Sequence, residues 1–410
     1  MINFNSVNEL VDFHTKGITP IYTSKSNLIV LNQKCIRDNQ INYSLAQYCK
    51  ETQKFSQNKI IKKGDLLVNS TGQGTAGRVA FVESVPDNIK VVIDSHILLL
   101  RFKSYETARC VNYLLHSFEN DLKGFLDGST GQGELDKIML FNTLIPLSNS
   151  KDVKKEAISL LELIDTKIKI NLKITKQLSH ISNYIYDYWL NLFQFPDVLG
   201  KPYKSSGGPM LWNIKLKREI PNDWEIKTLL DIANFQNGIP CQKFRPKKNE
   251  DFLRVIKIKE MHDGFSKNTE FVKKDVPQKI IVNNGDILFS WSASLSTKIW
   301  SGGVGALNQH IFKVTSNEYP KFFYFFELNR YLNHFKMMAE NRKTTMGHIT
   351  QEHLQQSKIL TPSKDLIDKL DVIIDPLLEK IIHCEKENTT LLNLRNWLMP
   401  FLINGHAIKT

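Results

Sequence analysis

The chain has 410 residues, and its 54 Lys and Arg against 42 Asp and Glu give a formal net charge of +12 and a pI near 9.2. This length predicts two domains or more, and the basic balance favours a polyanion such as nucleic acid over an acidic partner. The 5 cysteines are odd in number and never form a C-x-x-C pair, so we expect neither a disulfide framework nor a zinc site. The chain carries neither an export-type N-terminus nor an apolar run that could span a bilayer, so we expect a cytoplasmic protein.

The first segment, residues 1–148, is rich in predicted strands. Short β-branched or aromatic runs, LIVLNQKCI, GDLLVNST, GRVAFV and KVVIDSHILLLRF, are separated by turn residues, with one helical stretch at residues 107–118. A literal G-x-G-x-x-G occurs at residues 72–77. Dinucleotide binding would need a helix to begin at the last glycine of this motif. RVAFV at residues 78–82 has the alternation of a strand instead, so we disfavour a dinucleotide-binding enzyme.

A long helix follows at residues 149–195. From Lys151 to Phe193 apolar residues recur at heptad spacing without a proline or glycine, which is typical of a coiled coil. The predicted seam of this helix includes Leu161, Ile164, Ile168, Asn171, Leu178 and Ile185. Residues 196–220, rich in Pro, Gly, Ser and Lys, are predicted to form an irregular linker.

The second half repeats the first in order. Residues 221–362 contain LRVIKIKEM, GDILFSWSAS, TKIWSGG and LNQHIFKV and then a helical stretch. The matched anchors of the two halves are Gly17 with Gly238, Gly64-Asp65 with Gly285-Asp286, Gly131 with Gly347, and Pro146 with Pro362. The sequence therefore predicts an internal duplication.

The last segment, residues 363–410, repeats the heptad pattern in register. Its predicted seam includes Ile374, Leu377, Ile381, Asn388, Leu391 and Leu398. A helix with one apolar stripe cannot bury that stripe alone, so we expect the two long helices to pack on each other rather than to be ordinary core helices. Pro376, which follows Asp375, either begins a new helix or kinks a continuous one.

Polar loops at matched places are the candidate binding residues. The first pair of loops follows a strand in each half and contains Asn69, Ser70, Thr71 and Gln73, and Ser290, Trp291, Ser292 and Ser294. The second pair contains Ser129, Thr130 and Gln132, and Arg342, Lys343, Thr344, Thr345 and His348. Short hydroxyl and amide side chains suit hydrogen bonds to base edges, and Lys257 and Lys259 are candidate phosphate contacts. The alternative is that the loop residues only form turns.

Signatures of catalysis are missing from the sequence. It contains no N-P-P-Y or D-P-P-Y methyltransferase tetrad, no H-E-x-x-H and no G-x-S-x-G. We therefore predict no catalytic residues and no metal site in this chain.

At this point the chain resembles the specificity subunit of type I restriction–modification systems. The matching text is KKGDLLVNSTGQGTAG with NNGDILFSWSAS, GSTGQGEL with TTMGHIT, and YDYWLNLFQFPDVLGKPYKSSGGPMLWN followed by EIPNDWEIKTL. The first half lacks an I-P-x-x-W opening such as residues 220–224 give the second.

The resemblance implies an α+β fold. Two β-rich target-recognition domains with short helices, residues 1–148 and 221–362, are separated by two long antiparallel helices that form an intramolecular coiled coil. It also implies that each domain reads half of a bipartite, asymmetric double-stranded DNA site and that the helices set the spacer. The resemblance further implies that two modification (methyltransferase) subunits dock on the helices and that ATP-dependent restriction subunits join through them.

The same resemblance implies a non-catalytic subunit of a host-defence system. No cofactor is expected on this chain, whereas S-adenosylmethionine, ATP and magnesium are expected on the partner subunits. The alternative is a scaffold or adaptor with two protein-binding domains and a coiled-coil rod. Salt-dependent DNA binding would distinguish the two.

Overall fold

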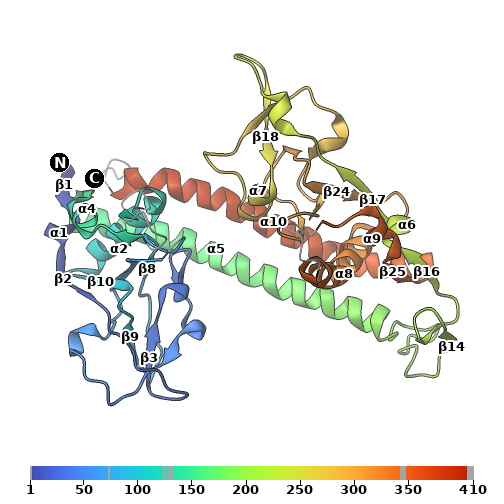
Figure 1. The fold of residues 1–410 in the computed structure, drawn as a ribbon, viewed down its shortest axis with the longest axis horizontal. Helices are drawn as coiled ribbons and strands as arrows, with labels where there is room; N and C mark the ends of the chain where they lie inside the picture. The colour runs from blue at the N-terminus through green and yellow to red at the C-terminus, as the bar shows by residue number, and fades with distance from the viewer. Residues whose placement is uncertain (1, 73, 123–125, 128–132, 342–347, 404–410) are drawn as a thin grey trace. The chain divides into compact units, whose positions relative to one another are not determined.

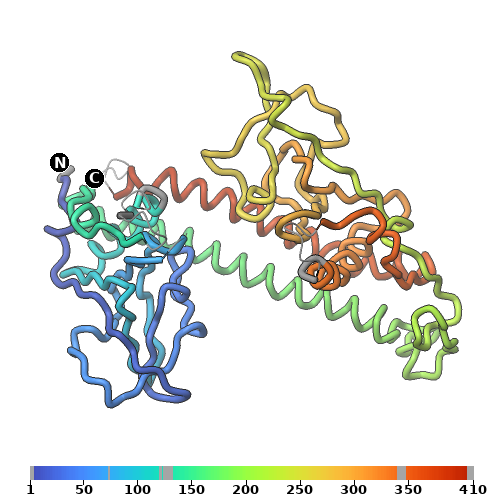
Figure 2. The backbone as a smooth tube through the Cα atoms, in the orientation of Figure 1, coloured from blue at the N-terminus to red at the C-terminus, as the bar shows by residue number. Residues whose placement is uncertain are grey.

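The computed structural model describes residues 2–72, 74–122, 126–127, 133–341 and 348–403. The chain divides into two compact units, whose path Figure 2 follows by colour. Unit 1 consists of Met1–Lys167 with Leu391–Thr410, and unit 2 of Ile168–Thr390. Each unit contains one β-rich half of the chain and a stretch of both long helices.

Unit 1 is built around a four-stranded sheet of order β2-β10-β7-β8, formed by Val11–Lys16, Ile97–Phe102, Leu66–Asn69 and Val79–Phe81. A second sheet, β6-β3-β9, consists of Gln47–Tyr48, Leu28–Leu31 and Lys90–Ile93. Short ladders pair β1 (Ile2–Ser6) with β13 (Leu144–Ser148), β4 (Ile36–Arg37) with β5 (Gln40–Ile41), and β11 (Leu126–Asp127) with β12 (Glu134–Leu135). The helices are α1 (Val7–Leu10), α2 (Tyr105–Ser117), α3 (Glu119–Leu122) and α4 (Lys137–Asn142).

Helix α2 shows why the local sequence folds as it does. Its N-cap Ser104 accepts a hydrogen bond from the Thr107 N–H, which satisfies one of the free amides of the first turn. Ala108, Val111 and Leu115 on its apolar face are buried, and the helix packs against β8 and β10 (Figure 1).

Unit 2 repeats this architecture. Its four-stranded sheet has the order β17-β24-β21-β22, formed by Asn234–Asn237, Ile311–Thr315, Ile287–Ser290 and Ser296–Ile299. Its second sheet, β19-β18-β23-β20, consists of Phe271–Lys273, Phe252–Ile256, Gly305–Leu307 and Ile281–Val282. Strand β16 (Glu225–Thr228) pairs with β25 (Lys358–Thr361), and β14 (Met210–Asn213) with β15 (Arg218–Pro221). The helices of this half are α6 (Leu229–Ile232), α7 (Ile258–Asp263), α8 (Lys321–Asn341) and α9 (Gln351–Gln356).

Matched details confirm the internal duplication. Gly17 and Gly238 each lie against a backbone turn, where an added Cβ would meet the Ile93 carbonyl oxygen at 2.0 Å and the Asn308 carbonyl oxygen at 2.3 Å. No side chain fits such a contact, so both copies keep glycine. The short helices α1 and α6 also begin with the same device, a capping box.

The two long helices are α5 (Lys151–Tyr186), which continues through a π-helical turn at Asp187–Asn191, and α10 (Lys364–Ile403). They pack antiparallel. In unit 1, Leu161 near the start of α5 shares a buried cluster with Leu402 near the end of α10. In unit 2, the Asn171 side-chain amide donates to Asn388 Oδ1 at 2.9 Å.

The buried positions of the helix pair keep heptad spacing with a slow drift. In α5, Leu161, Ile164, Ile168 and Asn171 are buried, and Leu178 and Ile185 are half-buried; in α10, Ile374, Ile381 and Asn388 are buried, and Leu377, Leu391 and Leu398 are half-buried. Leu378 and Met399, each one residue later, are more deeply buried than Leu377 and Leu398. An α-helix turns every 3.6 residues rather than every 3.5, so such drift is expected. Helix α10 runs through Pro376 without a break, so no new helix begins there.

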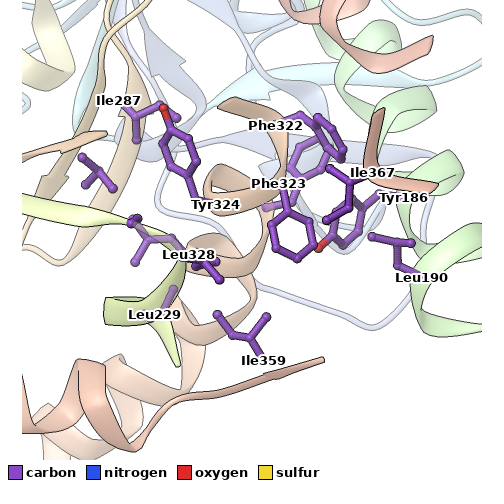
Figure 3. Packing of buried hydrophobic residues seen from close by; sticks show 14 of the residues in the cluster. Tyr186, Leu190, Leu229, Ile287, Phe322, Phe323, Tyr324, Leu328, Ile359 and Ile367 are labelled. Atoms are coloured by element: carbon purple, nitrogen blue, oxygen red, sulfur yellow. The ribbon is translucent and has the colours of Figure 1, made fainter. Parts of the chain in front are cut away.

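The core of unit 2 is aromatic and joins its β-rich half to the helix pair. Tyr186 and Leu190 from the end of the first long helix pack with Phe322 and Phe323 of α8, and Ile367 of α10 completes the contact (Figure 3). None of the helices in the described part of the chain is long and apolar enough to cross a membrane.

Candidate nucleic-acid interface

Three segments that are distant in sequence meet at one edge of unit 1. They are the loop after β7, the turn before β10 and the segment before α4. The Ser70 N–H donates to the His96 carbonyl at 2.8 Å, and the Leu135 N–H donates to the Ser70 carbonyl at 2.7 Å. Beside them Lys16 at the end of β2 forms an ion pair with Glu134. We name Lys16, Ser70, Thr71, His96 and Glu134 loop cluster 1.

The same three segments meet in unit 2. The Trp291 N–H donates to the His310 carbonyl at 3.4 Å, and the Ile349 N–H donates to the Trp291 carbonyl at 3.0 Å. The indole Nε1–H of Trp291 donates to Asn237 Oδ1 at 3.2 Å. The Trp291 ring centroid lies 5.8 Å from that of His310 and 5.5 Å from that of His348. We name Asn237, Trp291, Ser292, His310 and His348 loop cluster 2.

The two clusters correspond position by position. Lys16 and Asn237 each end the edge strand ahead of the matched glycine, and Ser70 and Trp291 each follow the central strand. His96 directly precedes β10, and His310 directly precedes β24. Glu134 precedes Leu135, whose N–H donates to Ser70, and His348 precedes Ile349, whose N–H donates to Trp291. The pairs are Lys16 with Asn237, Ser70 with Trp291, His96 with His310, and Glu134 with His348. Only the histidine is the same in both copies.

Several candidate residues from the sequence lie inside the protein. Asn69, Ser70, Ser290 and Ser292 are buried. The Asn69 amide donates to the carbonyls of Gln33 at 3.1 Å and Thr75 at 3.2 Å, and the Ser70 hydroxyl donates to the His96 carbonyl at 2.9 Å. These side chains hold the shape of the loops and do not face solvent.

Other candidates are at the surface. Thr71 and Trp291 are half-buried, and Ser294 and His348 are exposed. The Thr71 hydroxyl lies 2.8 Å from Nδ1 of His96. Gln73, Ser129, Thr130, Gln132, Arg342, Lys343, Thr344 and Thr345 lie outside the described residues.

The two candidate phosphate contacts differ in their surroundings. Lys257 Nζ forms an ion pair with Glu270, and the hydrogen bond from Lys257 lowers the pKa of that carboxyl. Lys259 is exposed on α7. A neutralised cation attracts a phosphate less than an unpaired one, so Lys259 is the better placed of the two.

Loop cluster 1 carries a full ion pair at the surface. The Lys16 and Glu134 side chains are 38% and 53% exposed. The hydrogen bond from Lys16 lowers the pKa of Glu134. Burial and the charge of Lys16 lower the pKa of the neighbouring Lys137. The cluster therefore presents both an ammonium donor and a carboxylate acceptor.

Sequence reasoning missed Lys16, His96, Glu134, Asn237 and His310. The two histidines carried a usable signal, because each stands directly before an isoleucine that opens a strand at a matched place in the duplication. Lys16 and Asn237 carried a similar signal, because each directly precedes the matched glycine of its half. Glu134 carries no such signal, since its role depends on contacts between segments far apart in the chain.

Comparisons with known proteins agree with this architecture. A family model described as the type I restriction modification DNA specificity domain matches residues 6–180 and 221–393. The chain is 24% identical over 293 residues to the type I restriction enzyme MjaIX specificity subunit of Methanocaldococcus jannaschii, covering 69% of this chain and 65% of that protein. It is 22% identical over 422 residues to the HindI specificity subunit of Haemophilus influenzae, covering 85% and 87% of the two chains.

A solved structure shares the fold. The crystal structure of a type I restriction–modification S subunit from M. genitalium aligns with a TM-score of 0.55 at 14% identity, covering 98% of this chain and 96% of that one. At this identity the likeness concerns the fold alone.

Proposed function

The chain belongs to the family of type I restriction–modification DNA specificity domains, and from this premise we propose that each of its β-rich halves reads one half of a bipartite, asymmetric DNA site. Residues 1–148 form the first recognition domain and residues 221–362 the second. The helical segments 149–195 and 363–410 and the linker 196–220 connect them. In this proposal the chain supplies sequence specificity, and partner subunits supply the chemistry.

The proposal rests on one observation, which is that the two units share an arrangement of strands but differ in the residues of their loop clusters. The strand order of the four-stranded sheet is repeated in the two units, while three of the four matched positions in the loop clusters differ in chemical type. Two copies of one binding frame with different surface groups suit two different ligands. On DNA they suit two different half-site sequences.

The helix pair is proposed to set the spacer and to dock two modification subunits. The buried seam and the Asn171–Asn388 hydrogen bond fix the register of the two helices. Apolar side chains also remain on their outer faces: Leu163 of α5 is 65% exposed, and Trp397 of α10 is 64% exposed. Exposed aromatic and aliphatic groups on helices favour a protein partner at that face.

We test the proposal by exchanging one recognition domain. Residues 1–148 are replaced by the corresponding segment of another family member, the chain is assembled with its modification subunits, and methylated DNA sites are sequenced. One half-site should change while the other half-site stays the same. Simultaneous change of both half-sites would contradict independent reading. Methyl transfer by the purified chain without modification subunits would contradict its non-catalytic role.

A protein-binding adaptor is the second candidate. The observation that favours it is the hairpin of β14 and β15, where Leu211 is 55% and Trp212 65% exposed. An adaptor would bind random DNA weakly and would select no sequence. A specificity subunit should select a bipartite site, with an affinity that falls steeply as salt is raised.

A further inference from the structure

We propose that loop cluster 1 reads a G·C base pair and that loop cluster 2 reads an A·T base pair, one in each half-site. The inference rests on the proposed function and deepens it, because it assigns base identities to matched residues. It depends on what each cluster can donate and accept.

Loop cluster 1 has the groups that match the major-groove edge of a G·C pair. Guanine presents two acceptors, N7 and O6, and cytosine presents one donor, the N4 amino group. Lys16 carries three N–H donors and uses one on Glu134. The others remain available to guanine, while Glu134 retains lone pairs for the cytosine amino group. The ion pair would then lie along the edge of the base pair with both charges satisfied.

The surroundings hold loop cluster 1 in place. The Gln33 amide donates to the Thr71 hydroxyl, so the hydroxyl proton is available for Nδ1 of His96, 2.8 Å away. This arrangement anchors the loop next to Glu134, because Thr71 and Glu134 also form a β-bridge. A preorganised pair loses little side-chain entropy on binding, so more of the energy of its contacts is retained as affinity.

Loop cluster 2 has the groups that match an A·T pair. An asparagine amide can donate to adenine N7 and accept from the N6 amino group. The indole N–H of Trp291 can only donate, so its bond to Asn237 fixes the carbonyl end of that amide and leaves the NH₂ group directed elsewhere. The carbonyl keeps a second lone pair for adenine N6.

The indole ring of Trp291 supplies the apolar half of the recognition. The ring is half-buried between His310 and His348, and Phe312 lies 5.8 Å from it between ring centroids. A fixed apolar face beside the adenine reader suits the C5-methyl group of thymine, which only an A·T pair presents in the major groove. Among the described members of loop cluster 2 there is neither a carboxylate nor an ammonium group.

The test uses near-isosteric substitutions in the full-length chain. Glu134→Met removes the carboxylate that accepts from cytosine, and Asn237→Asp removes the amide donor to adenine N7. Each variant is incubated with a double-stranded DNA library randomised in both half-sites, and bound sequences are compared with those of the parent. Lys25→Asn and Asn317→Asp serve as controls, since both positions are exposed and outside the clusters. Thermal denaturation confirms that all variants are folded.

We expect Glu134→Met to lower the preference for one G·C pair in the first half-site by roughly 5- to 150-fold, the range for one good base contact. Asn237→Asp should lower the preference for one A·T pair in the second half-site by a similar factor. Each variant should leave the other half-site unchanged. The double variant Lys16→Asn with Glu134→His places the matched residues of cluster 2 in cluster 1 and should abolish the G·C preference.

The outcomes separate this inference from the proposed function. If the parent chain selects no bipartite site, the proposed function fails. If the parent selects a bipartite site and the variants keep every base preference, the function stands and the base assignment is overturned. A changed preference of the control variants equal to that of the cluster variants would also overturn it.

Discussion

A largely buried charge network should make Asp165 the most sensitive side chain where the β-rich half of unit 1 joins the helix pair. In unit 1 the Asp165 carboxylate accepts from Arg395 Nη1 at 2.8 Å and from the Tyr113 hydroxyl at 2.7 Å. Arg109 Nη2 lies 3.7 Å away, and the Arg109 side chain is only 4% exposed. Replacing Asp165 by leucine would leave these groups facing an apolar side chain.

The magnitude follows from the burial of the network. Removing one member of a buried ion pair costs about 3–5 kcal/mol, because the remaining charge stays desolvated. Arg109 keeps part of its compensation through Glu162, 3.1 Å from its Nε, so most of the cost falls on Arg395. Replacing Arg395 by methionine as well should therefore recover up to about 3 kcal/mol relative to the sum of the single changes.

Hydrogen exchange is the suitable assay, because a chain of two compact units does not have one well-defined unfolding free energy. Peptides that cover α2 report the local opening free energy of the recognition domain against the helices. Glu156→Leu is the matched control, because Glu156 is exposed and lies on α5 like Asp165. This change should cost less than about 0.5 kcal/mol. Equal protection of α2 in the Asp165→Leu and Glu156→Leu variants would refute the reasoning.

Three further predictions concern the helix pair and the thiols. Asn388→Leu should lower the hydrogen-exchange protection of both long helices around this position, because the Asn171 amide loses one of its two acceptors and keeps only Glu387; leucine at both positions should restore or raise that protection, as hydrogen exchange of the parent and the two variants would show. Inserting one heptad after Leu178 and another after Ile381 lengthens both helices by about 10 Å, so site selection should show a spacer longer by about three base pairs; an unchanged spacer in a folded variant would contradict the spacer role. Burial raises the pKa of Cys110 to about 12, so a thiol reagent at pH 8 should modify it only after denaturation, which mass spectrometry of labelled peptides would detect.

The helix pair and the duplication could be predicted because both are written as long, regular patterns. Leu161 and Ile374 occupy the same heptad position in two helices that differ in most other residues. A periodic signal over more than thirty residues is stronger than the noise of single positions. That the buried positions drift follows from the helical period, but the place of the drift, from Leu377 to Leu378, could not be predicted, since it depends on how the helices relax against each other.

The candidate site could be predicted only by region. The sequence located the loops after the central strands, but polar residue type does not reveal burial. Asn69 and Ser290 have side chains of a type that could contact bases at the surface. Both are instead fully buried and stabilise the loops from inside. The Lys16–Glu134 ion pair joins residues from distant segments, and no local pattern encodes it. The domain boundaries stay a prediction.

The duplication has diverged at the attachment of each recognition domain as well as at its loops. Tyr113 of α2 donates to the carboxylate of Asp165 on α5, whereas in unit 2 Glu327 of α8 accepts from the hydroxyl of Tyr186 on α5. In one unit the recognition domain provides the donor, and in the other it provides the buried acceptor. No member of either loop cluster takes part in these contacts. Lys16, Glu134 and Asn237 are therefore separate from the attachment contacts, whereas Trp291 packs against the aromatic core that joins unit 2 to the helices. Substitutions of the first three residues can alter base preference without removing an attachment contact.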